Sequence, residues 1–251
     1  MKTILLLITT FIGIHISAQK TEAYYDYRWK PCTPENARFY SEVTKTDSGW
    51  LRNDYFLGTK SLQMSGLFED SANKIANGFF RYFYANGIPE SFGKNVHNKK
   101  EGLWVRYHQN GMMDDSTWYV NGNPSGASFG WHSNGSLSDS IMYNPDGSAV
   151  EVDWCTNGSP SGAGRLMNGK LNGTWQFFHN NGRLAAREMY YNGKLLSREY
   201  YDTAGVQEDT TSKDRNAIFP GGQAAWTKFV YKHIFFPDGY KLVNGDQVTV
   251  V

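Results

Sequence analysis

The segment Gly102–Gly111 reads GLWVRYHQNG, and the segment Gly173–Gly182 reads GTWQFFHNNG. Asn-Gly between alternating apolar and polar residues is the strongest short-range signal of a β-hairpin. The pair recurs along the chain and closes with Ala204-Gly205, so that consecutive glycines are 24, 24, 23, 24 and 23 residues apart. A fixed period of this length predicts a repeat architecture. The hairpin-turn glycines are Gly87, Gly111, Gly135, Gly158 and Gly182.

Each turn glycine is preceded, four positions earlier, by an aromatic residue. This column consists of Phe83, Tyr107, Trp131, Trp154, Phe178 and Tyr201. A second Asn-Gly lies near mid-period, as at Asn121-Gly122, and we expect positive φ at both positions of every such pair. Stacked hairpins place each aromatic beside its equivalent in the next unit, about 9.6 Å further along the sheet. We therefore expect an elongated antiparallel meander in which the column is a structural aromatic ladder.

The two quoted segments resemble the bacterial variant of the MORN repeat, whose pattern is G-x-W-x-x-Y-x-x-N-G. The resemblance covers about residues 38–205, and it assigns residues 65–205 to repeats of 23–24 residues. Three positions depart from the pattern, because Ala149 stands where glycine is expected and Ser128 and Glu151 stand where tryptophan is expected. Residues 19–64 resemble the lead-in of envelope proteins that combine such repeats with a TonB end. We expect their strands to cap the array.

The N-terminus carries the order of a secretory signal peptide. Lys2 precedes an apolar run over residues 4–16, and the small residues Ser17 and Ala18 follow it, which predicts a signal peptide over residues 1–18. The run is too short for a membrane anchor. Without Lys2 the chain has 24 basic and 24 acidic residues. This balance argues against nucleic-acid binding and against strong binding to anionic membranes. We expect an exported protein, periplasmic or associated with the envelope.

The C-terminal end has a different composition. Residues 206–216 are polar and predict a linker, and Trp226, Phe229 and His233 follow with helical spacing. Residues 217–251 resemble the start of a TonB C-terminal domain, and the chain ends inside its first long strand, so we expect an incomplete α/β segment. The motif residues of this resemblance are Phe219, Pro220, Gly221, Gly222, Trp226, Phe229 and Pro237.

Three histidines share one repeat column with Cys155, and they raise the question of a metal site. Equivalent residues of neighbouring units are about 9.6 Å apart, whereas zinc ligands lie about 2.0–2.3 Å from the metal. We therefore predict no metal and no cofactor. The carboxylates Asp114, Asp115, Glu151 and Asp153 fit a solvated strand face better than an acid/base pair. Cys32 and Cys155 leave open whether they form a disulfide.

These observations predict a non-enzymatic interaction scaffold of the cell envelope that binds a protein partner. The TonB resemblance implies an outer-membrane receptor or a component of the TonB system as that partner. One alternative is binding of glycans or choline-type amines along the aromatic ladder, with cation–π contacts supplying the energy. Another is an antitoxin-like role, which the repeat resemblance implies and the export signal disfavours.

Overall fold

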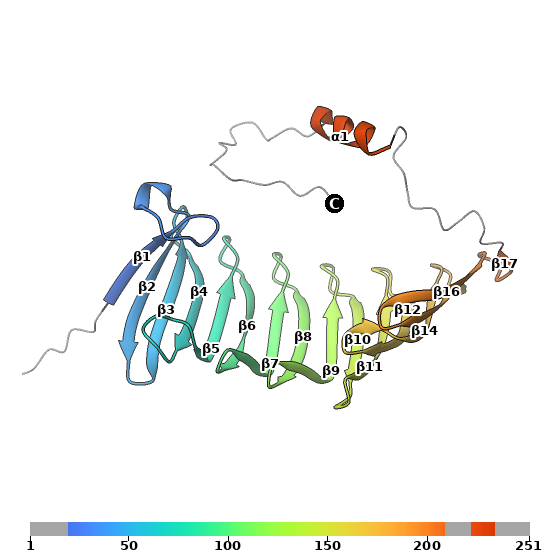
Figure 1. Ribbon diagram of the computed structural model, residues 1–251, viewed down its shortest axis with the longest axis horizontal. Coiled ribbons are helices and arrows are strands. Elements are labelled where there is room, and N and C mark those ends of the chain that lie inside the picture. The colour runs from blue at the N-terminus through green and yellow to red at the C-terminus, as the bar shows by residue number, and fades with distance from the viewer. Residues whose placement is uncertain (1–19, 209–221, 234–251) are drawn as a thin grey trace, which may run out of the picture. The chain divides into compact units, whose positions relative to one another are not determined.

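The computed structural model describes residues 20–208 and 222–233 (Figure 1). The chain divides into two units, one up to Glu208 and one from Asp209 onward. The signal-peptide prediction, Phe219, Pro220, Gly221, Pro237 and most of the predicted linker lie outside the described residues. No helix in the described ranges is long and apolar enough to cross a membrane.

The first unit is one antiparallel sheet of 17 strands, in which each strand except β13 pairs with the next strand along the chain. The short β13 pairs with β12, which also pairs with β14. The predicted β-hairpin meander is thus confirmed. The elements are β1 (Lys20–Tyr25), the 3₁₀ turn η1 (Pro34–Asn36), β2 (Phe39–Thr46), β3 (Gly49–Phe56), β4 (Leu62–Phe68), β5 (Ala76–Phe83), β6 (Pro89–Val96), β7 (Lys99–Tyr107), β8 (Met113–Val120), β9 (Asn123–Trp131), β10 (Leu137–Tyr143), β11 (Ser148–Trp154), β12 (Pro160–Met167), β13 (Lys170–Leu171), β14 (Gly173–Phe178), β15 (Leu184–Tyr191), β16 (Lys194–Tyr201) and β17 (Gln207–Glu208).

The turns at the two edges of the sheet are of different kinds. In the β5–β6 hairpin the Gly87 amide donates to the Tyr84 carbonyl at 2.9 Å, and only the glycine has positive φ, at 83°. At the other edge, Asn121 and Gly122 both have positive φ, at 52° and 84°. The expectation of positive φ at both positions therefore holds for the mid-period turns and is wrong for the five repeat-defining turns.

The asparagines of the repeat-defining turns connect neighbouring units instead. The Asn86 side-chain amide donates to the Gln109 carbonyl at 3.1 Å, 23 residues further on. Its carboxamide oxygen also accepts the Ile88 amide at 3.1 Å, which fixes the turn. The same cross-unit bond recurs three times, from Asn110 to Ser133, from Asn134 to Thr156 and from Asn181 to Thr203.

Buried rings lie on one face of the sheet, which we call the ring face. Trp104 lies flat over Gly93 of the preceding strand, where an added Cβ would fall 2.3 Å from the indole. Its indole N–H donates to the Lys94 carbonyl at 3.0 Å. Trp175 repeats the arrangement over Gly164, and Phe80 lies over Gly66. Glycine in the facing strand is therefore what allows a thin single sheet to bury a ring.

The ring column is interrupted in the middle of the array. Ser128 and Glu151 occupy the positions equivalent to Trp104 and Trp175, and the Ser128 hydroxyl lies 2.6 Å from that of Thr117. The buried residues accordingly form two separate clusters. One contains Met64, Phe68, Phe80 and Trp104, and the other contains Ala149, Leu166 and Trp175.

The outer edge of β1 is partly covered by the chain that follows it. Pro31 forms a bridge with Tyr25, and the Cys32 amide donates to the Tyr24 carbonyl at 3.0 Å. The Trp29 ring stacks on Phe39 at 4.3 Å between centroids. Occupied backbone groups at an edge strand reduce pairing with other chains.

In the second unit, the helix α1 (Gly222–His233) spans the segment for which helical spacing predicts a helix. Trp226 and Phe229 lie on it three residues apart, and their rings stack with centroids 6.0 Å apart. Both side chains are exposed.

Candidate functional site

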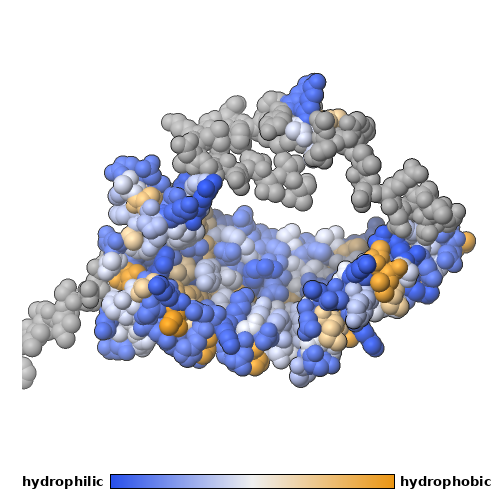
Figure 2. All heavy atoms as spheres, viewed as in Figure 1, coloured by the Kyte–Doolittle hydropathy of each residue, from blue (hydrophilic) through white to orange (hydrophobic). Residues whose placement is uncertain are grey.

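Opposite the ring face, large apolar side chains remain in solvent. Leu103 of β7 lies opposite Trp118 of β8, and Met142 of β10 lies opposite both Ala127 of β9 and Val150 of β11. We call these five residues the apolar row. Leu103, Trp118, Met142 and Val150 are 48%, 51%, 53% and 49% exposed. Hydrophobic residues, orange in Figure 2, reach the surface of the sheet unit at several places.

Cationic side chains flank the apolar row on both sides. Lys94 of β6 lies opposite Phe79, another exposed ring of this face, and Arg165 of β12 lies opposite Val150. Both cations are exposed. With strands about 4.8 Å apart, the six strand steps from Lys94 to Arg165 span about 29 Å. The surface is therefore apolar in its centre, with the cation Arg165 at one end and the oppositely charged pair of positions Lys94 and Glu101 at the other.

On the ring face, four carboxylates gather where the rings are missing. Asp139 lies opposite Asp153, and Asp115 and Asp139 lie on either side of Gly130. Glu151 precedes Asp153 by two residues and therefore lies on the same face of β11. We call Asp115, Asp139, Glu151 and Asp153 the carboxylate cluster. The carboxylate cluster lies between the two buried hydrophobic clusters, so carboxylates of like charge stand there in place of packed apolar side chains.

Burial and mutual repulsion change the acidity of the carboxylate cluster. Desolvation first, and then the charges of Asp153 and Asp139, raise the pKa of Glu151 to about 7. Desolvation and Asp139 also raise the pKa of Asp153. Near neutral pH, Glu151 can therefore hold a proton in its hydrogen bond with Asp153.

The structure groups three of the four carboxylates singled out in the sequence. Asp115, Glu151 and Asp153 belong to the carboxylate cluster, whereas Asp114 forms an ion pair with Arg106, with Nε and Oδ2 2.5 Å apart. The sequence reasoning missed Asp139, although it follows Asp115 by one period of 24 residues. Within residues 20–208 and 222–233, no three His, Cys, Asp or Glu side chains are arranged to hold a metal ion.

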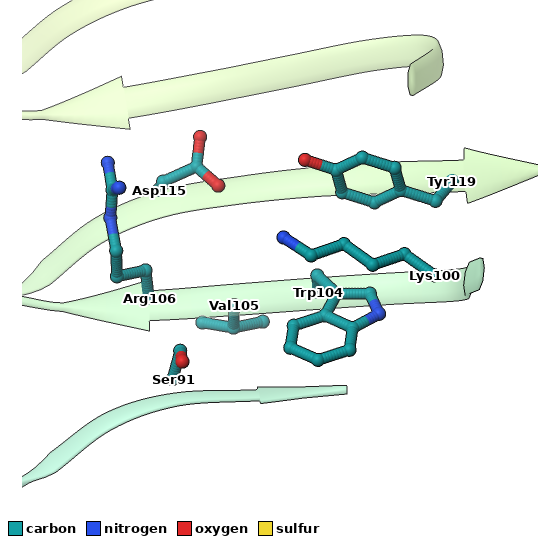
Figure 3. A pocket seen from close by; sticks show the side chains of 7 residues that line it. All are labelled: Ser91, Lys100, Trp104, Val105, Arg106, Asp115 and Tyr119. Carbon is teal, nitrogen blue, oxygen red and sulfur yellow. The ribbon is translucent and has the colours of Figure 1, made fainter. Parts of the chain in front are cut away.

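A small cavity opens on the ring face beside Trp104. It has a volume of about 200 Å³, and Lys100, Trp104, Arg106, Asp115 and Tyr119 line it together with Ser91 and Val105 (Figure 3). The Lys100 ammonium lies 4.5 Å from the centroid of the Trp104 ring and 4.8 Å from that of Tyr119. No motif in the sequence pointed to Lys100.

The aromatic ladder lies at the necks of the hairpins and is half-buried. Its members lie opposite the residue two positions after each turn glycine, as Tyr107 does with Met113 and Trp131 with Leu137. Ring contacts join Tyr107 to Phe92 and Trp131 to Phe129. The most deeply buried rings are those of Phe80, Trp104 and Trp175, which belong to a different column.

The histidine column bonds to the backbone of this ladder. The His132 Nε2 lies 2.8 Å from the Trp154 carbonyl, and the His108 and His179 rings repeat the contact with Trp131 and Tyr201. Because a carbonyl oxygen only accepts, the imidazole N–H donates. In the same column, the Cys155 sulfur lies 3.9 Å from the Asn180 carboxamide oxygen, and Cys155 and Cys32 are both free thiols.

No protein-family model matches the chain, and no curated protein shows a significant match to it.

Proposed function

We propose that this protein is a non-enzymatic interaction scaffold of the cell envelope and that it binds a protein partner through the apolar row. The observation that carries the proposal is the half-exposure of Leu103, Trp118, Met142 and Val150 on adjacent strands of one face. Contiguous exposed apolar residues rimmed by polar ones are typical of protein interaction surfaces. Tryptophan at the centre of such a surface is a frequent source of binding energy.

Charge indicates the chemistry of the partner. Arg165 lies beside Val150 at one end of the row, and Lys94 lies opposite Glu101 at the other end, about 29 Å away, so a complementary surface has an apolar centre and a carboxylate that faces Arg165. Such pairing favours correct orientation and fast association more than affinity. The partner is accordingly a protein with an apolar surface that has a carboxylate at one end.

The cellular location and the finer family assignment rest on sequence resemblance. The order of residues 1–18 supports export, and the recurring G-x-W-x-x-Y-x-x-N-G pattern supports a MORN-like array. The TonB-like motif supports a partner that is an outer-membrane receptor or a TonB-system component. Exposed Trp226 and Phe229 on α1 offer that partner a second apolar contact.

Lysine side chains of the protein itself already cover aromatic rings that could otherwise bind choline-type amines, and this favours protein binding as the function. Lys100 already places its ammonium over Trp104 and Tyr119, and Lys45 lies 5.5 Å over Trp50. These rings satisfy their attraction for cations within the chain. An external quaternary amine would first have to displace a tethered lysine.

Photo-crosslinking in intact cells tests the proposal. A photoreactive amino acid replaces Ala127, which is exposed in the middle of the apolar row. We expect one specific crosslinked envelope protein, identified by mass spectrometry, that also binds the purified full-length chain. The double variant Trp118→Ser, Met142→Ser should lose this crosslink, because both side chains are half-exposed and their loss leaves the buried clusters intact.

The matched control is Leu196→Ser. Leu196 is 59% exposed on β16, outside the row, so this variant should crosslink as the wild type does. Undiminished crosslinking in the double variant, or accumulation of the protein in the cytoplasm, would contradict the proposal.

A further inference from the structure

The cavity beside Trp104 brings charged groups of both signs together. Figure 3 shows the Lys100 ammonium, the Tyr119 hydroxyl and the Asp115 carboxylate pointing toward one another above the β7–β8 strand pair, with Arg106 beside Asp115. Arg106 forms an ion pair with Asp114. Lys100 and Asp115 face the same space as a second cation and a second anion.

Burial in the cavity disfavours the charged forms of these two groups. Desolvation, together with nearby Arg106, lowers the pKa of Lys100, although Asp115 acts in the opposite direction. Desolvation, Asp139 and Asp114 raise the pKa of Asp115, against the hydrogen bond from Thr117 and the charge of Arg106. An anion beside Lys100 would reverse the first effect, and a cation beside Asp115 would reverse the second. One ligand with both charges meets both requirements.

We propose that this cavity binds a small zwitterionic α-amino acid, with its carboxylate on Lys100 and its ammonium on Asp115. The Tyr119 hydroxyl can donate a further hydrogen bond to the ligand carboxylate. Since a water molecule occupies about 30 Å³ of liquid, a cavity of about 200 Å³ holds roughly seven water-sized groups. Alanine fits this space, and the rings of Trp104 and Tyr119 supply apolar walls for its side chain.

This site is independent of the apolar row, because the Trp104 side chain projects from the face opposite to that of Leu103 and Trp118. It is also distinct from the half-buried aromatic ladder. Loss of binding to the protein partner would leave amino-acid binding unchanged. Loss of amino-acid binding would likewise leave binding to the protein partner unchanged.

Titration of the full-length protein with L-alanine tests the site, with the ¹³Cε resonance of Lys100 as the readout. We expect a saturable shift and a rise in the pKa of Lys100. Propionate lacks the ammonium and ethylamine lacks the carboxylate, so each should bind at least about tenfold more weakly than alanine. Equal binding of either single-charge analogue, or no saturable shift with alanine, would overturn the proposal.

Variants provide the second arm. Lys100→Gln and Asp115→Asn should each weaken alanine binding, measured by isothermal titration calorimetry, by about tenfold or more. Lys45→Gln is the control, since Lys45 also lies over a tryptophan ring but does not line the cavity. Equal weakening by this control would show a nonspecific effect and contradict the assignment. If either cavity variant unfolds, the titration of the wild-type protein with alanine, propionate and ethylamine, followed by the Lys100 resonance, tests the proposal without the variants.

Discussion

The imidazole Nε2 of His132 lies 2.8 Å from the backbone carbonyl of Trp154, a residue one repeat further along the chain. Each histidine of this column therefore joins two neighbouring hairpins at a point that strand pairing leaves open. Replacing His132 by alanine should lower the free energy of unfolding by about 0.5–1.5 kcal/mol. Urea denaturation of the purified protein measures this. Ser133→Ala, at the exposed adjacent turn position, is the control and should change stability little.

Cys155 occupies the histidine column without an imidazole. Cys155→His places a ring donor within reach of the Phe178 carbonyl, which is the equivalent of the Trp154 carbonyl. We expect a gain of about 1 kcal/mol in the free energy of unfolding. The serine side chain of Cys155→Ser is too short to donate a hydrogen bond to the Phe178 carbonyl, so this variant should give no such gain. A destabilised histidine variant would mean that the unit after Cys155 is not aligned as its neighbours are.

Gly93 provides the space in which the Trp104 indole lies. A Cβ at this position would fall 2.3 Å from the ring, so Gly93→Ala must displace the indole or the strand. Overpacking of this kind costs about 1–3 kcal/mol. Thermal unfolding should show the loss together with a changed tryptophan emission. Gly58→Ala is the control, because an added Cβ there meets nothing within 4 Å.

Glu151 makes the stability of the sheet depend on pH. Its pKa is raised to about 7 in the folded protein, from 4.5, so its stabilising contribution is complete below about pH 4.5 and is lost as the pH rises to about 7. Glu151→Gln should therefore stabilise the protein at pH 8, by about 1–2 kcal/mol after allowance for solvent screening, and much less at pH 5.

Urea denaturation at the two pH values measures the difference. Glu90→Gln, on β6 and outside the carboxylate cluster, should show no such pH dependence. An equal gain at pH 5 and pH 8 for Glu151→Gln would show that charge repulsion in the cluster is not the cause.

The fold was largely predictable because the signal for a hairpin is local. Asn110-Gly111 and its equivalents mark the turns, and the period between them requires successive hairpins to pair in order. The turn geometry was less predictable, since Asn86 and Asn121 stand before glycine in the same dipeptide but only Asn121 has positive φ. The difference lies in the turn type, because the Tyr84 amide donates to the Ile88 carbonyl and the Gly87 amide to the Tyr84 carbonyl, which makes a longer loop with a single left-handed glycine.

The sites were predictable only in part. The departures at Ser128 and Glu151 marked the middle of the array as unusual, and the carboxylate cluster lies there. Which of the two aromatic columns is deeply buried was harder to predict, because Trp104 and Tyr107 are both aromatic. The glycine that faces Trp104, Gly93, is what leaves room for its ring to be buried. The apolar row and the Lys100 cavity depend on strand register across several units, and a glycine bulge such as that at Gly102 shifts this register.

Because each strand pairs with a strand next to it in sequence, and only the short β13 is bypassed by the pairing of β12 with β14, the array has no interlocking topology. A gene encoding it can gain or lose one block of about 24 codons, and the hairpins on either side of the change can still pair. Duplication or deletion in the β7–β8 region would alter the length of the surface presented to a partner in steps of about 9.6 Å. Evolution of such a protein can therefore proceed by copying whole units rather than by redesigning a core.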